Sequence, residues 1–161
     1  MEQLYRDQFA HFINTGANAD TPTWTLEGVG VDALALSYNP QIDQYKTIIQ
    51  RNADATFNNY QVQSSVSGKR LYKGDKMYEF LNEARKNLKA IETQILEVEM
   101  ASADVSGGYT ATKFNCLIVI DEFLGENATI GYTLYLKGDP VHGTATIADG
   151  VPTFVDSADA E

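Results

Sequence analysis

The chain has 161 residues, of which 43% are apolar and 21% are charged, so it can build the core of one folded domain and is not a disordered protein. Its net charge of −10 excludes ordinary binding to nucleic-acid backbones, which depends on basic side chains that displace counterions. No segment approaches the roughly 20 apolar residues of a membrane span, and the first residues lack the features of a secretory signal, so we expect a soluble protein made in the cytoplasm with no membrane partner.

The start of the chain predicts an N-terminal arm or a short helix over residues 1–16, ahead of a single β domain over residues 17–155. Its apolar side chains suit a helical stripe, and an extended arm against a neighbouring subunit would use the same residues: Leu4, Tyr5, Phe9, Phe12 and Ile13. A polar, glycine-containing stretch over residues 14–23 separates this segment from the first strand region.

Alternating apolar side chains predict strands from residue 23 onward, first around Leu34 and Leu36 and then over residues 60–66. The long segment between them, residues 40–59, has an apolar centre at Tyr45, Ile48 and Ile49. Loops of this length are uncommon in small domains unless they have a function. The segment therefore predicts either an extra hairpin folded back on its own subunit or a projecting interaction surface.

Residues 75–88 predict one α-helix. Asp75 is a good N-cap because its carboxylate can accept hydrogen bonds from unpaired backbone amides. An apolar stripe follows at helical spacing: Met77, Phe80, Leu81, Ala84 and Leu88. Such a helix buries its stripe against one face of a sheet.

Further strand segments follow the helix. They cover residues 96–100, 114–123, 130–137, 143–147 and 153–155, with turns predicted at KGDP and ADGVP and a loose acidic tail over residues 156–161. The fold class is therefore mainly β (α+β), a β-sandwich or partial barrel with one flanking helix and a long inter-strand loop or hairpin.

No arrangement of residues indicates catalysis or a cofactor. Asp121 and Glu122 are adjacent, so on a strand they point to opposite faces. His11 and His142 lie far apart in sequence without ligand-like companions, and Cys116 lies in an apolar run typical of a buried thiol. We expect no enzymatic activity, no metal and no cofactor.

Charge is distributed unevenly along the chain. Residues 51–89 carry eight of the twelve basic side chains and four acidic ones, a net charge of +4, whereas the other positions net −14. A basic helix face and loop exposed to water is the simplest interpretation. The alternative is self-complementarity, in which the basic segment of one copy meets the acidic surface of another.

The order of these parts resembles the tail tube, or major tail, proteins of long-tailed bacteriophages. The resemblance covers residues 22–154 and rests on four stretches: TWTLEGVGVDALALSYNP, QIDQYKTIIQRNADATFNNYQVQ, GDKMYEFLNEARKN and LYLKGDPVHGTATIADGVPTF. It implies a virion protein whose copies close into six-fold rings and stack into a tube that lets DNA pass without specific binding. The implied partners are further copies of the chain and other tail proteins, such as the tape measure and terminator proteins.

The resemblance also implies roles for particular residues. The long segment corresponds to the part that reaches the neighbouring ring, and the implied ring-stacking interface comprises Tyr45, Ile48, Ile49, Arg51, Lys69 and Arg70. One polar sheet face would line the channel, with the lumen-facing candidates Gln61, Gln63, Glu97 and Glu99. The two glutamates would repel the phosphates of passing DNA.

Two other classes of protein fit the same sequence. One is a related ring protein, such as a tail terminator, a baseplate hub protein or the inner tube of a contractile system, which would form isolated rings where a tail tube protein forms filaments. The other is a small ligand-binding β domain that uses Trp24 and the nine tyrosines as platforms. That domain would be a monomer with clustered exposed aromatic side chains.

Overall fold

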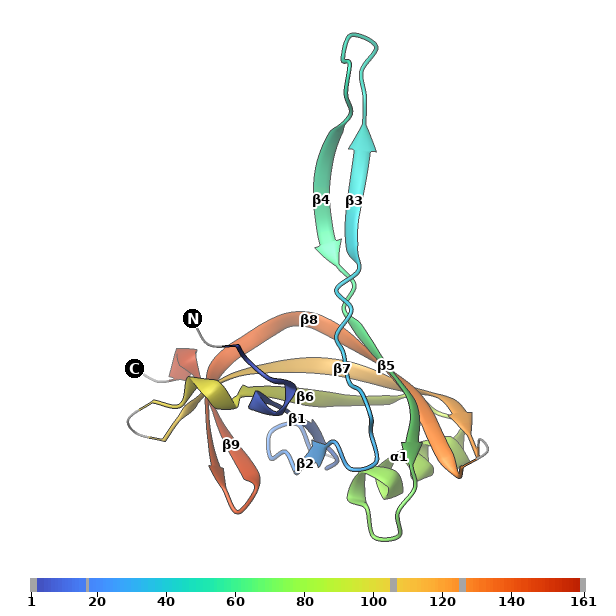
Figure 1. Cartoon of the computed structure of the whole chain (residues 1–161), viewed down its shortest axis with the longest axis vertical. Helices are drawn as coiled ribbons and strands as arrows, with labels where there is room; N and C mark the ends of the chain where they lie inside the picture. The colour runs from blue at the N-terminus through green and yellow to red at the C-terminus, as the bar shows by residue number, and fades with distance from the viewer. Residues whose placement is uncertain (1–2, 17, 105–106, 125–126, 160–161) are drawn as a thin grey trace.

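A computed structural model describes residues 3–16, 18–104, 107–124 and 127–159 of the chain. Within these ranges it contains one α-helix, nine strands and three short 3-10 turns (Figure 1). The helix α1 spans Lys76–Asn87. The strands are β1 (Phe9–Asn14), β2 (Trp24–Glu27), β3 (Pro40–Tyr45), β4 (Asp54–Tyr60), β5 (Gln63–Arg70), β6 (Ile91–Glu99), β7 (Tyr109–Phe123), β8 (Thr129–Ala148) and β9 (Val151–Asp156).

Seven of these strands form one antiparallel sheet. The order is β2-β1-β6-β7-β8-β5, and β9 also pairs with β8. β8 accommodates both β5 and β9 because it is twenty residues long: its first half pairs with β5 and its second half with β9. The sheet curls into a nearly closed barrel with one flanking helix, which confirms the predicted fold class.

The segment after β2 helps to close the barrel. The backbone N–H of Arg70 donates to the carbonyl of Gly30 at 2.9 Å, and Ser37 and Gln63 exchange two backbone hydrogen bonds of 2.8 and 3.0 Å. The segment therefore runs antiparallel beside β5. Between these bonded ends, residues 31–36 are not a strand, so the strand predicted around Leu34 is wrong, although Leu34 itself is buried.

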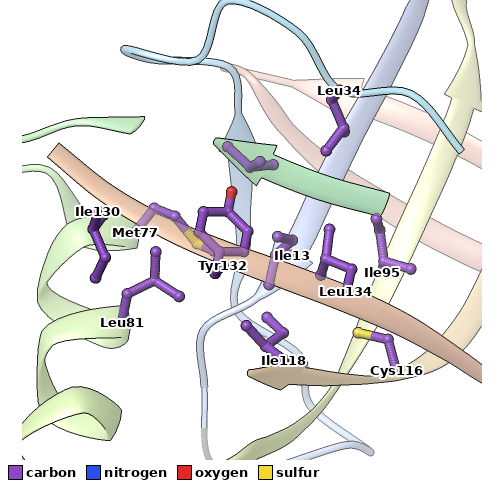
Figure 2. Packing of buried hydrophobic residues seen from close by; sticks show 11 residues of the cluster. Ile13, Leu34, Met77, Leu81, Ile95, Cys116, Ile118, Ile130, Tyr132 and Leu134 are labelled. Carbon is purple, nitrogen blue, oxygen red and sulfur yellow. The ribbon is translucent and has the colours of Figure 1, made fainter. Parts of the chain in front are cut away.

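Apolar side chains fill two cores on opposite faces of the sheet. Directly paired residues of antiparallel strands point to the same face, so the register separates neighbours such as Ile95 and Leu96. The first core, between the sheet, α1 and the segment after β2, contains Ile13, Leu34, Val66, Met77, Leu81, Ile95, Cys116, Ile118, Ile130, Tyr132 and Leu134 (Figure 2). The second contains Phe12, Trp24, Leu96, Val98, Ala111 and Ala145, with Phe154 of β9 packed against it.

Helix α1 forms where its sequence predicts, although Leu88, which was predicted to lie in the buried stripe, is exposed. The Asp75 carboxylate accepts a hydrogen bond from the Met77 backbone N–H at 3.0 Å, and Leu88 ends the helix with a left-handed φ of 51°. Met77, Leu81 and Ala84 are its buried residues. The helix therefore covers one end of one sheet face and leaves the rest of that face to other elements.

Strands β3 and β4 form a separate two-stranded hairpin that projects from the barrel (Figure 1). Every residue of β4 is exposed. Residues 40–59 therefore project and do not fold back on their own subunit; their use as an interaction surface stays a prediction.

Three local predictions are wrong. The N-terminal segment is not a helix beyond the 3-10 turn Arg6–Gln8, because Phe9–Asn14 form β1 inside the sheet, paired with both β2 and β6. The sequence KGDP does not end a strand, since β8 continues through it and takes up the positive φ of 67° at Gly138. The tail is ordered as far as Asp156, which ends β9, and the turn Ser157–Asp159, while residues 160–161 lie outside the described residues.

Candidate assembly surfaces

The tip of the hairpin presents isoleucines to solvent. Ile48 and Ile49 have relative exposures of 101% and 91%. The turn is held by its own polar groups: the Gln50 side chain accepts a hydrogen bond from the Thr47 N–H at 2.9 Å and donates one to Asp54 at 2.6 Å. An exposed apolar tip on an ordered turn is typical of a contact surface rather than of a solvated loop.

One face of the hairpin is also apolar. Ile42 pairs with Phe57 across β3 and β4, and the rings of Phe57 and Tyr60 lie 4.8 Å apart, with Tyr38 5.7 Å from Tyr60. All four side chains are more than half exposed. Sequence reasoning missed this cluster, although Ile42 and Phe57 sit among polar neighbours at strand spacing. A two-stranded hairpin with an uncovered apolar face is marginally stable alone, and a partner surface over that face would stabilise it.

The basic residues of the predicted stacking interface lie in different environments. Arg51 is exposed near the tip, and Arg70 is exposed on β5, where its guanidinium lies 3.1 Å from the Asp32 carboxylate. Lys69 is completely buried, so its assignment to a surface contact is wrong. A β-bulge after Val66, at which Gly68 has a φ of 88°, turns the Lys69 side chain inward.

Lys69 belongs to a buried polar cluster that sequence reasoning did not find. Its Nζ lies 3.1 Å from Oδ2 of Asp75 and 3.8 Å from Oε1 of Glu27, and it donates to the Val29 carbonyl. The hydroxyl of Tyr132 donates to the same Glu27 oxygen. Burial raises the pKa of Glu27, and the Lys69 charge opposes this only in part. Burial also raises the pKa of Tyr132.

The resemblance implied that the four lumen-facing candidates share one sheet face. The structure shows that they do not. Gln63 lies on one face, in a row of directly paired residues that leads through Tyr135 and Leu117 to Glu92. Glu97 lies on the opposite face, because it is an odd number of positions from Glu92 along β6. Glu99 shares the face of Glu97, and Gln61 is exposed between β4 and β5.

Glu97 is held by the N-terminal strand. Its carboxylate lies 2.8 Å from Nε2 of His11, whose Nδ1 lies 3.1 Å from an Arg6 nitrogen. The hydrogen bond to His11 holds the pKa of Glu97 below its ordinary value of 4.5. The residue thus has a structural role on β6 whichever surface it faces in an assembly.

Two edges of the sheet are open. Among the described residues, β2 pairs only with β1 and β9 only with β8. Open edges present unpaired backbone groups that can pair with another chain. The alternative use of Trp24 as a ligand platform has no support, since its side chain is only 8% exposed in the second core.

The described part of the chain meets neither the requirements of a metal site nor those of a membrane-spanning helix. No group of three or more histidine, cysteine, aspartate or glutamate residues there is placed to hold a metal ion. No helix in those ranges is long and apolar enough to cross a membrane.

The fold is similar to that of a component of a known assembly. A chain in the cryo-EM structure of the anti-feeding prophage (AFP) baseplate, 6-fold symmetrised, matches with a TM-score of 0.53 at 8% identity, covering 88% of this chain and 96% of that one. No family model matches the sequence, and no curated protein matches it. At this identity the similarity shows the shared fold.

Proposed function

We propose that this chain is a structural subunit of a phage-tail-like particle, in which its copies close into rings. The projecting hairpin with fully exposed Ile48 and Ile49 is the observation that carries the proposal, because a domain that acts alone gains nothing from holding two isoleucines in water. The open edges at β2 and β9 give each copy a surface for a lateral neighbour. The similarity to a chain of a six-fold symmetrised baseplate supports the same reading.

Within such a particle we assign the chain to the tail tube, stacked in six-fold rings around a channel through which DNA passes. The hairpin then reaches the next ring, and further partners are the tape measure and terminator proteins. A baseplate ring protein is the second candidate, favoured by the assembly to which the similar chain belongs. The two candidates form different assemblies. A tube subunit repeats its stacking contact from ring to ring, whereas a baseplate subunit does not.

Negative-stain microscopy of the purified chain at increasing concentration distinguishes these functions. Filaments of stacked rings are expected for a tail tube protein, and isolated rings would assign the chain to the baseplate class. A chain that remains a monomer at the highest concentration would overturn both the tail tube and the baseplate assignment.

Substitution of Ile48→Asp or Ile49→Asp is expected to block stacking without unfolding the barrel. A charge cannot be buried unpaired in an apolar contact, so the concentration needed for filaments should rise by at least about tenfold, which is about 1.4 kcal/mol. Filament length and critical concentration, measured by microscopy and light scattering, check this.

The matched control is Leu88→Asn. Leu88 is 92% exposed, like the isoleucines, but lies at the end of α1 with a left-handed φ that suits asparagine. Filaments from this variant should be normal. Unchanged filaments from the Ile48 and Ile49 variants would remove the hairpin tip from the interface.

A further inference from the structure

The buried cluster around Lys69 brings together groups from four elements. Lys69 is the penultimate residue of β5, Glu27 ends β2, Tyr132 lies on β8, and Asp75 precedes α1. The side chains of Lys69 and Glu27 are fully buried, and that of Asp75 is 9% exposed. The cluster therefore excludes bulk water from a lysine amine and two carboxyl groups.

The cluster is imperfect as an ion pair. It holds two carboxyl groups against one lysine. Two of the four carboxyl oxygens receive no well-aligned hydrogen bond from the described part of the chain. Oε2 of Glu27 has no hydrogen-bond partner among the described residues, and Oδ2 of Asp75 accepts no well-aligned hydrogen bond even though Nζ of Lys69 lies 3.1 Å away. Buried polar atoms are normally satisfied, so this arrangement calls for an explanation.

We propose that Lys69 and Asp75 condense into an intramolecular amide cross-link, with Glu27 carrying the proton. The proposal concerns the chemistry of the single chain and does not depend on its assembly into rings. A covalent bond between β5 and the start of α1 would remove the buried charges of both partners and tie the helix to the sheet.

The step balances in atoms and electrons. The reacting forms are the neutral Lys69 amine and the protonated Asp75 carboxyl, reached when one proton passes from the ammonium to the carboxylate. Nζ forms a bond to Cγ of Asp75, and Glu27 takes a proton from Nζ and delivers it to Oδ2. The Cγ–Oδ2 bond breaks and Oδ2 leaves as water, with nothing oxidised or reduced.

The geometry favours the attack of the amine on Asp75. The amine and the carboxyl are held in contact by the fold, which makes the reaction effectively unimolecular, and the dry site opposes hydrolysis of the amide. Oδ1 accepts the Met77 backbone N–H at 3.0 Å, so the helix amide stabilises the charge that develops on that oxygen. Oδ1 remains in the product, and the N-cap of α1 is kept.

Glu27 lies beside the reacting amine. Its Oε1 is 3.8 Å from Nζ, so a small approach brings the two atoms within hydrogen-bond distance, and the Tyr132 hydroxyl fixes the orientation of the carboxyl. Burial raises the pKa of the Glu27 carboxyl, as suits a group that takes up a proton and returns it.

Intact mass measurement of the denatured, purified chain tests the proposal directly. The expected mass is one water less than the sequence mass. Trypsin can cut within the closed loop at Arg70 and Lys73, so the digest should contain a branched peptide in which Lys69 is joined to Asp75. A chain with the full sequence mass would overturn the proposal.

Variants separate the cross-link from other losses of water. Asp75→Ser retains an N-cap oxygen and should have its full sequence mass, and so should Lys69→Met. Glu27→Gln should form the link roughly a hundredfold more slowly, as for loss of a general acid–base group. Equal linkage in Glu27→Gln would overturn the role of Glu27.

The chain also provides a matched control. Lys137 and Glu92 form an ion pair at 2.9 Å, closer than that of Lys69 and Asp75, but both side chains are about half exposed or more. This pair should remain unlinked in the same digest, because water competes at the surface. A link there would show that contact alone suffices and would overturn the role of burial.

Discussion

Cys116 lies on β7 with 1% of its surface exposed, in the first core. Its sequence context predicted a buried thiol, and the structure confirms this. Burial raises the pKa of the thiol to about 12, so the thiolate is scarce at neutral pH.

Thiol labelling is therefore expected to be slow in the native chain and complete only after unfolding. Both the low access and the raised pKa of Cys116 oppose attack on a reagent. The rate of reaction with a chromogenic disulfide, compared with the rate in denaturant, measures this. Native labelling at the rate of a free cysteine would show that the core opens readily at β7.

The lowered pKa of Glu97 makes the free energy of unfolding depend on pH. The pKa of its carboxyl is lowered in the folded chain, mainly by the hydrogen bond to His11, so its stabilising contribution is complete above its ordinary value of 4.5 and is lost as the pH falls through the folded pKa. Glu97→Gln should lower the free energy of unfolding at pH 6 by more than at pH 3. Urea unfolding at the two pH values checks this.

The control for this prediction is Glu99→Gln. Glu99 lies on the same face of β6 but is exposed, so its substitution should change the free energy of unfolding little at either pH. If the cost of Glu97→Gln were the same at pH 3 and pH 6, the bond to His11 would have no part in stability.

At the scale of elements, the short strand β9 depends on a close approach to β8. A Cβ atom added at Gly143 would lie 2.1 Å from the Val155 carbonyl oxygen and 2.8 Å from the Phe154 ring. The two strands can pair there only because residue 143 is glycine. Phe154 packs against the second core, so the contact also positions part of that core.

Gly143→Ala is therefore expected to displace β9 and destabilise the chain by about 1–3 kcal/mol, as an overpacked site does. Gly28→Ala is the matched control, because a Cβ there meets no atom within 4 Å. Chemical denaturation of the two variants gives the difference. Equal stabilities would show that β9 is not held against the second core.

In β1, pairing with neighbouring strands overrides the helical spacing of the apolar residues. The apolar residues near the N-terminus suited a helical stripe, but Phe12 and Ile13 are adjacent and each enters a different core. A strand with both faces covered has no alternation to detect. Its pairing with β2 and with β6, which is more than eighty residues away in the chain, defines its structure.

At the scale of the whole molecule, the basic segment is smaller than its composition suggests. Lys69 is buried and Arg70 is paired with Asp32. The other exposed basic side chains of this region lie in two places: in and around α1 (Lys73, Lys76, Lys86 and Lys89), and at the hairpin tip, where Arg51 and Lys46 lie beside the isoleucines. If the tip contacts the next copy, unlike charges attract across that junction.

Arg51→Glu should therefore weaken assembly, and rising salt should weaken assembly of the native chain, because exposed charges are screened over about 10 Å at 0.1 M. Light scattering against ionic strength measures both effects. The salt dependence should be smaller in Arg51→Glu. Assembly that strengthens with salt would assign the contact to the isoleucines alone.

Local patterns in the sequence determined the helix at residues 76–87, most of the strands and the apolar hairpin tip. Helical and strand periods are set by neighbouring residues, so they can be read without knowing what packs against them. The capping carboxylate of Asp75 and the alternation in β8 belong to this class.

Only the tertiary structure decided which face each strand residue occupies and which charges are buried. Glu97 lies between two apolar residues and Gln63 follows Val62, so each reads as the polar side of an alternating strand, yet register between distant strands places them on opposite faces. Lys69 entered the core through a one-residue bulge. A shift of one residue in strand register moves a side chain to the other face of the sheet. The local pattern of apolar and polar residues does not indicate such a shift.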